Sequence, residues 1–109
     1  MSDYDALWRI VDGLNTKFPA SSQDVYHFLA RLTEEVGELA EQINHQYGAS
    51  LSKADKLGVP NRMALAEEIR DVLTKALAIA RFTRVESELH TAIAAQQDTL
   101  LTQGFLEER

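Results

Sequence analysis

The sequence predicts an all-α protein, an antiparallel bundle of four or five helices that forms one domain over residues 1–109. Apolar residues recur at steps of three and four along most of the chain, which is the period of an amphipathic helix. Both prolines lie between these periodic stretches, where turns are expected. A chain of 109 residues can bury a core of ordinary size but is at the small end of domain lengths, where oligomerisation often supplies more burial. We therefore expect a homodimer or homotetramer to complete the bundle.

Composition and charge exclude several classes of protein. The chain has no cysteine, so it can form neither a disulfide nor a thiolate nucleophile or zinc–thiolate site. It has no apolar run of about 18 residues and no N-terminal leader, so we expect no membrane partner and a cytoplasmic location. The net charge of −6 argues against a nucleic-acid partner, which would need clustered Lys and Arg. An acidic protein that binds a polyphosphate must bring in metal ions.

The first helix is predicted to begin after a cap at Ser2 or Asp3 and to run to about Leu14. The following segment contains Phe18-Pro19 and Ser21-Ser22, which indicate a turn into a second helix capped by one of the two serines.

The second helix is predicted over residues 23–45 and carries the sequence LTEEVGELAEQI. Its apolar stripe steps by three and four and comprises Leu29, Leu32, Val36, Leu39 and Ile43. His27 and His45 form no Glu-x-x-His pair, which disfavours a di-iron bundle, and we expect both on the surface.

Three carboxylates of this helix, Glu34, Glu35 and Glu38, fall within an arc of roughly 100°. Glu35 and Glu38 lie nearer the apolar stripe and are expected to reach inward. Like charges at this spacing repel, so we expect a counter-charge. Arg31, one turn earlier, either neutralises Glu35 or contacts a phosphate of a ligand.

Helical periodicity lapses over residues 46–61, where Gly48, Gly58 and Pro60 interrupt the chain. Three cations, Lys53, Lys56 and Arg62, lie in or beside this loop. They suggest a lid over a polyphosphate, and a solvated loop explains them equally well.

The third helix is predicted to begin after a cap at Asn61. Its buried side is expected to comprise Leu65, Ile69, Val72, Leu73 and Ala76. Glu68 and Asp71 lie one turn apart beside that stripe, and Lys75 follows four residues after Asp71, where it can pair with it or reach a phosphate. Thr83 to Glu86 has the form of a capping box, so a further helix is expected to start there.

Two acidic clusters on two helices suit a hard divalent cation such as Mg²⁺ or Mn²⁺, which prefers oxygen ligands. Acidic residues are also ordinary on the surfaces of helices, so a solvated acidic face is the alternative. Gly37, which costs about 1 kcal/mol relative to Ala in a helix, suggests that something approaches the backbone closely at this point.

The paired pattern EEVGEL at 34–39 and EIRDVL at 68–73 resembles the EExxE and ExxD motifs of the MazG-like all-α nucleotide pyrophosphohydrolases. The resemblance covers about residues 8–81 and fades beyond them. It implies a Mg²⁺ site, with Mn²⁺ as a substitute, held by Glu35, Glu38, Glu68 and Asp71, and catalytic roles for Glu34, Glu35 and Glu38. In this family the segment before the motif helix lies near the base, which makes Asn15 and Phe18 base-pocket candidates.

The resemblance implies hydrolysis of a nucleoside triphosphate to the monophosphate and pyrophosphate, as in house-cleaning of the nucleotide pool. Arg31, Lys53, Lys56, Arg62 and Lys75 are then candidates for binding the substrate phosphates. A competing interpretation is a catalytically inactive MazG-like bundle that serves as a nucleotide-binding or protein-interaction module. A third keeps the enzyme with another ligand, such as a dinucleotide or a modified nucleotide.

Overall fold

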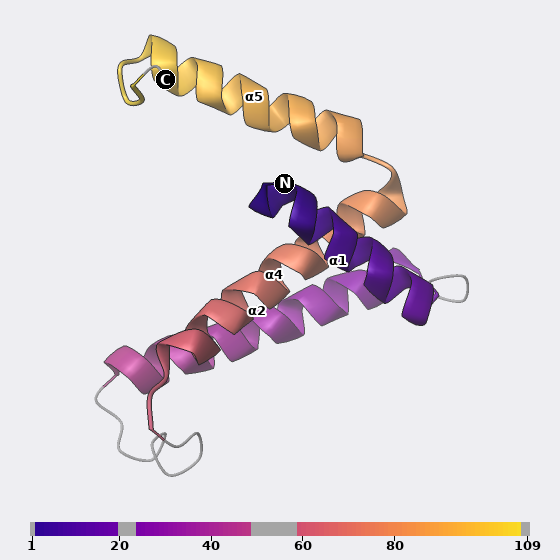
Figure 1. Ribbon diagram of the computed structural model, residues 1–109, viewed down its shortest axis with the longest axis vertical. Coiled ribbons are helices and arrows are strands. Elements are labelled where there is room, and N and C mark those ends of the chain that lie inside the picture. Colours follow the sequence, from indigo (N-terminus) through magenta and orange to yellow (C-terminus); the bar gives the residue numbers. More distant parts are fainter. Residues whose placement is uncertain (1, 20–23, 49–58, 108–109) are drawn as a thin grey trace. The chain divides into compact units, whose positions relative to one another are not determined.

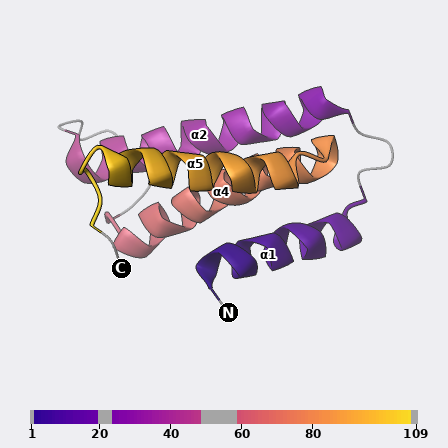
Figure 2. The same ribbon diagram turned by 90° about the horizontal axis from the view of Figure 1, so that it is seen from above.

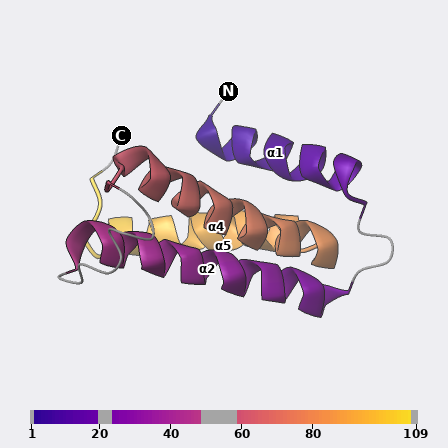
Figure 3. The same cartoon turned by 90° about the horizontal axis from the view of Figure 1, so that it is seen from below.

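Helices α2 (Val25–Tyr47) and α4 (Arg62–Thr83) run antiparallel and side by side in the computed structural model, as Figures 1 and 3 both show. The structure describes residues 2–19, 24–48 and 59–107, and over these residues it contains helices and no strand. The predicted all-α class is therefore confirmed for this part of the chain. The side chain of Gln46 donates to the carbonyl oxygen of Asn61 at 2.8 Å and ties the end of α2 to the start of α4.

The chain divides into two compact units, Met1–Ile79 and Ala80–Arg109, and α4 continues across the boundary. Helix α1 (Asp3–Lys17) belongs to the first unit, and α4 lies between α1 and α2 in the views from above and below (Figures 2 and 3). Buried apolar residues are few: among the described residues they are Val11 and Ala80, which are 4% and 7% exposed. Over the described residues this core is smaller than the core of ordinary size expected from the chain length.

Local capping explains where the first unit's helices begin. The Ser2 hydroxyl accepts from the backbone N–H of Asp5 at 3.1 Å, as predicted for a cap at this position. Asp24 caps α2 by accepting from the N–H of His27 at 3.0 Å, so the expected serine cap was wrong; Ser21 and Ser22 lie outside the described residues. Asn61 caps α4 as predicted, because its side-chain oxygen accepts from the N–H of Met63 at 2.7 Å.

The packed face of α2 is rotated away from the apolar stripe that the sequence suggests. Leu32 and Leu39 are half-buried, whereas Leu29, Val36 and Ile43 are exposed. Glu35 and Gln42 are half-buried instead.

The same correction applies to α4. Leu65 and Val72 are half-buried as expected, but Ile69, Leu73 and Ala76 are exposed. Glu68 and Asp71 are half-buried. In both helices polar side chains therefore occupy part of the face that is shielded from solvent.

The second unit comprises the last turn of α4 and helix α5 (Glu86–Thr102), drawn in orange and yellow in Figure 1. The break falls where it was predicted, but the capping box does not form, because no side chain caps α5. Instead α4 ends with Arg84 in the left-handed region, at φ 61°, and the N–H of Val85 bonds back to the carbonyl of Ala80 at 3.0 Å. This is the hydrogen bond of a Schellman ending.

Candidate metal centre

Three carboxylates from two helices converge in the first unit. Glu35 of α2 and Glu68 and Asp71 of α4 each offer an oxygen, and these oxygens all lie within 4.8 Å of one another. All three side chains are half-buried. The antiparallel pairing of α2 and α4 thus brings together residues more than thirty positions apart in the sequence.

The electrostatics of this acidic cluster are those of crowded like charges. The pKa of Glu68 is raised from 4.5 to about 7, first by burial and then by the negative charges of Glu38 and Glu35. The pKa of Glu38 is also raised, mainly by the charge of Glu35. A bound cation would relieve this repulsion.

The inner oxygens of the cluster have no hydrogen-bond partner within the described part of the chain. Oε2 of Glu35 and Oε2 of Glu68 are both buried and unpaired. A buried carboxylate oxygen without a donor is costly unless a cation or water satisfies it. The donor set is entirely carboxylate oxygen, which is what a hard divalent cation such as Mg²⁺ prefers. The residues therefore fit the metal that the sequence suggests.

The other two glutamates of the motif lie at the edge of this cluster. Glu34 and Glu38 are exposed on α2. Both remain electrostatically coupled to the site, because the charge of Glu34 helps to raise the pKa of Glu38 and the charge of Glu38 raises the pKa of Glu68. Glu38 is thus close to the three converging side chains although it does not belong to that group.

The expected counter-charge at Arg31 is absent. Arg31 is exposed and makes no ion pair with a described carboxylate, so the predicted bridge to Glu35 was wrong. A cation that the sequence reasoning missed, Arg70, pairs instead with Asp71, with its Nη2 2.9 Å and its Nε 3.0 Å from Oδ1. This pair is partly exposed. The charge of Glu68 also acts on Arg70, because it helps to raise the pKa of that guanidinium group.

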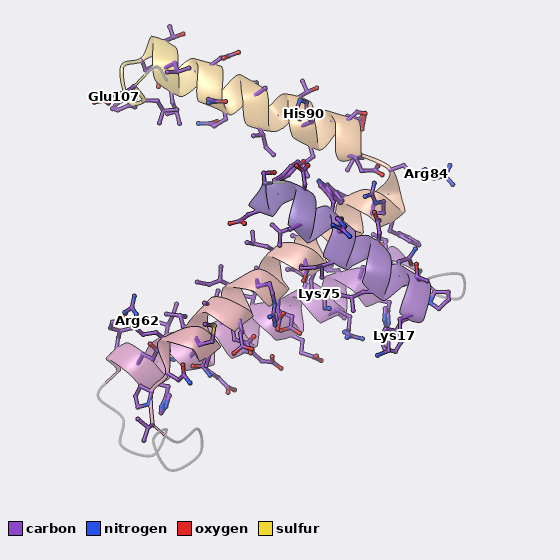
Figure 4. All side chains as sticks on the ribbon, in the orientation of Figure 1. Lys17, Arg62, Lys75, Arg84, His90 and Glu107 are labelled. Atoms are coloured by element: carbon purple, nitrogen blue, oxygen red, sulfur yellow. The ribbon has the colours of Figure 1, made fainter. Side chains whose placement is uncertain are left out.

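Lys75 lies on α4 seven residues after Glu68, in the stretch that runs beside α2, whereas Arg62 lies at the opposite end of the helix (Figure 4). Lys75 is half-buried and forms no ion pair with Asp71 or another described carboxylate within 4 Å. Its ammonium group therefore remains available to an anionic ligand. Arg62 is exposed.

The remaining predicted ligand-binding residues are Lys53, Lys56, Asn15 and Phe18. Lys53 and Lys56 lie outside the described residues. Asn15 and Phe18 are exposed at the end of α1, where the ammonium group of Lys17 lies 5.4 Å from the centre of the Phe18 ring. The close approach expected at Gly37 is not made by the described chain, because a Cβ at that position would meet nothing within 4 Å.

Sequence reasoning also misplaced His45, which was expected on the surface. The side chain is 9% exposed, and neither ring nitrogen has a hydrogen-bond partner. Gln42, one turn earlier, is half-buried with its Oε1 unpaired. The spacing indicates this for Gln42, which lies seven residues after the half-buried Glu35, but not for His45, because Glu38, seven residues before it, is exposed. His27, in contrast, is exposed as predicted.

None of the described helices combines the length and the apolar character needed to span a bilayer. No solved structure matches the chain significantly. An uncharacterized protein of Bacillus subtilis (strain 168), YpjD, is 40% identical over 60 residues, which cover 55% of this chain and 50% of YpjD. The chain therefore aligns with about half the length of this curated relative.

The model of the MazG nucleotide pyrophosphohydrolase domain matches residues 23–100. The match begins after α1 and extends well into α5, so the family likeness reaches further along the chain than residue 81, where the sequence motifs fade. It includes both acidic clusters that meet between α2 and α4. Because the match covers most of the chain, this protein belongs to the MazG nucleotide pyrophosphohydrolase family.

Proposed function

We propose that this protein is a Mg²⁺-dependent nucleoside triphosphate pyrophosphohydrolase that releases a nucleoside monophosphate and pyrophosphate. The observation that carries the proposal is the convergence of Glu35, Glu68 and Asp71 from two helices, with buried oxygens left unpaired. The family of the chain supports the reaction class. The preferred base and sugar follow from neither.

In this proposal Glu35, Glu38, Glu68 and Asp71 hold the metal. When bound, Mg²⁺ would neutralise the triphosphate and lower the pKa of an attacking water. The exposed carboxylate of Glu34 borders the cluster and orients that water. Water is added across the anhydride bond between the α and β phosphates, so no covalent intermediate with the protein is needed, in keeping with the absence of cysteine.

The cations beside the site would bind the phosphates. Lys75 is the strongest candidate, because it is half-buried on the helix that carries Glu68 and Asp71 and has no carboxylate partner there. Arg31 lies one turn before the glutamates of α2 and is also unpaired among the described residues. Release of pyrophosphate from the substrate removes a triphosphate from the nucleotide pool, which is the house-cleaning role that we infer.

The test is pyrophosphate release from a panel of ribo- and deoxynucleoside triphosphates with Mg²⁺, with Mn²⁺ and with a chelator. We expect metal-dependent release by the wild-type protein and a loss of at least about a hundredfold in Glu38→Gln, because even outer-shell partners of a metal contribute 10–100-fold. Glu67→Gln is the matched control, since Glu67 is an exposed glutamate next to the site on α4. Circular dichroism checks that helix content is unchanged.

Two results would count against the proposal. Full Mg²⁺-dependent turnover by Glu38→Gln would remove this residue from the site. If the wild-type protein binds nucleotides but releases pyrophosphate from no triphosphate of the panel, it would instead be a catalytically inactive nucleotide-binding module.

A further inference from the structure

Gln42 and His45 form a second polar group on the shielded side of α2, which we call the Gln42–His45 pair. His45 is nine-tenths buried, yet neither Nδ1 nor Nε2 has a hydrogen-bond partner among the residues that the structure describes. The buried Oε1 of Gln42 is unpaired as well. Burying polar atoms without partners is unfavourable, so a cluster of them in a native protein calls for a ligand or water that satisfies them.

The placement of this pair relates it to the acidic cluster. His45 lies seven residues after Glu38, which corresponds to about 10 Å along the helix and nearly the same direction around it. Gln42 lies between them, one turn after Glu38. The Gln42–His45 pair therefore continues the line of side chains that starts with the metal-binding glutamates.

The antiparallel register fixes which groups lie on either side of the cluster. Gln46, next to His45, is hydrogen-bonded to Asn61 at the start of α4. From Asn61 the helix α4 runs past Glu68 to Lys75, away from the His45 end. The order along α2 and α4 is thus the Gln42–His45 pair, the carboxylates, and then Lys75.

The chemistry differs at the two ends of this line. Lys75 carries a positive charge and suits a phosphate. A neutral imidazole offers one donor and one acceptor, and the Gln42 oxygen offers an acceptor. An acceptor oxygen repels a phosphate, whereas this combination matches the edge of a nucleobase, which also carries a donor beside an acceptor. The half-buried Leu39 and Leu65 on the same two helices suit the faces of a flat, largely apolar ring.

We propose that Gln42 and His45, rather than the exposed Asn15 and Phe18, bind the base edge of the nucleotide and select among bases, while the phosphates extend past the carboxylates toward Lys75; this inference rests on the proposed function. A pocket built to hydrogen-bond its ligand discriminates strongly against ligands that leave its buried polar groups unpaired. The pair is accordingly a determinant of base specificity.

The experiment compares four ligands that carry a base with one that lacks it. Calorimetric titrations with Mn²⁺ present measure the affinity for AMP, GMP, CMP and UMP against ribose 5-phosphate. The variants are His45→Phe and Gln42→Met, which keep approximate shape and remove the hydrogen-bonding atoms. His27→Phe is the matched control, because His27 is an exposed histidine on the same helix.

We expect at least one monophosphate to bind wild type and His27→Phe about tenfold more tightly than ribose 5-phosphate, as hydrogen bonds to buried partners would give. Both pair variants should lose that preference while their affinities for Mn²⁺ and ribose 5-phosphate stay within twofold. Their melting temperatures should equal or exceed that of wild type, because unpaired polar atoms have been removed.

Retention of the base preference in both variants would overturn the proposal, as would a wild type that binds every monophosphate no more tightly than ribose 5-phosphate. The pyrophosphate-release panel separates this result from the fate of the enzyme. If the wild type turns over triphosphates and the variants keep its base preference, the proposed activity stands and the role of the Gln42–His45 pair is rejected. If the wild type shows no turnover but the variants lose its base preference, the role of the Gln42–His45 pair stands and the proposed activity is rejected.

Discussion

Glu68 is the residue through which pH acts most directly on the acidic cluster. Burial and the charges of Glu38 and Glu35 raise its pKa to about 7, from an ordinary value of 4.5. Between these two values the folded protein keeps a proton on Glu68 that the unfolded chain has released. Since the folded state then binds more protons, this group's contribution to stability falls as pH rises from 4.5 to about 7 and is fully lost above it.

We therefore expect the metal-free Glu68→Gln variant to lose less stability than wild type between pH 4.5 and about 7. Above pH 7 the variant should be more stable than wild type. Urea unfolding in the presence of a chelator, repeated across the pH range, measures both effects. Adding Mn²⁺ should stabilise the wild type above pH 7 and do much less for the variant. The idea fails if the two proteins show the same pH profile without metal.

Lys75 has a charge without a described carboxylate partner, and this gives a clear kinetic prediction. Its ammonium group forms no ion pair with a described carboxylate, so an anionic ligand is its natural partner. Lys75→Met should raise KM for the triphosphate about tenfold or more, since hydrogen bonds to charged groups contribute about 1.5–3 kcal/mol. Affinity for Mn²⁺ in the absence of nucleotide should not fall.

Lys17→Met is the control for the Lys75 variant, because Lys17 is an exposed lysine at the end of α1 (Figure 4). Steady-state kinetics on both variants distinguish a phosphate contact from a general effect of lost positive charge. Equal KM values for the two variants would show that Lys75 does not contact the substrate.

At the scale of the helices, local signals predicted the caps of α1 and α4 correctly, those of α2 and α5 wrongly, and the packed faces poorly. Ser2 and Asn61 cap their helices through their own side chains, so the adjacent sequence contains the whole interaction. Which face of α2 is buried depends on α4 as well. The apolar spacing therefore pointed to Val36, whereas pairing with α4 buries Glu35 and Gln42 instead.

The junction after α4 shows a different limit of sequence reasoning. The break was located correctly, but Thr83 and Glu86 do not cap α5, and Glu86 pairs with Arg81 at 3.0 Å. Arg84 takes the left-handed conformation that normally favours glycine. A signal based on residue type could not reveal a Schellman ending at an arginine.

This conformation predicts that Arg84→Gly stabilises the protein. A non-glycine residue in the left-handed region costs about 1–2 kcal/mol. Glycine removes this cost but loses more backbone entropy on folding, which offsets part of the gain. We expect a net gain of roughly 0.5–1 kcal/mol in the free energy of unfolding, measured by urea denaturation. Arg84→Ala removes the same side chain but keeps the Cβ, so a matching gain in that variant would show that the backbone conformation is not the cause.

At the scale of the whole molecule, the notable feature is how little apolar surface is fully buried. Leu29, Val36 and Ile43 recur every seven residues along α2 and are each about half exposed. Exposed Ile69 and Leu73, one turn apart, mark a similar surface on α4. Contiguous exposed apolar residues at helical spacing are typical of surfaces that associate. The predicted homodimer or homotetramer would bury them.

We expect light scattering after size-exclusion chromatography to give the mass of a dimer or tetramer for wild type. Val36→Lys should shift the protein toward monomer and weaken association by at least about tenfold, because a buried unpaired ammonium group is strongly unfavourable. His27→Lys introduces the same charge on the opposite side of α2, where it is exposed, and should leave the mass unchanged. A wild-type monomer, or a Val36→Lys variant with the wild-type mass, would exclude this face of α2 as the interface, and the exposed leucines and isoleucines would then need another partner.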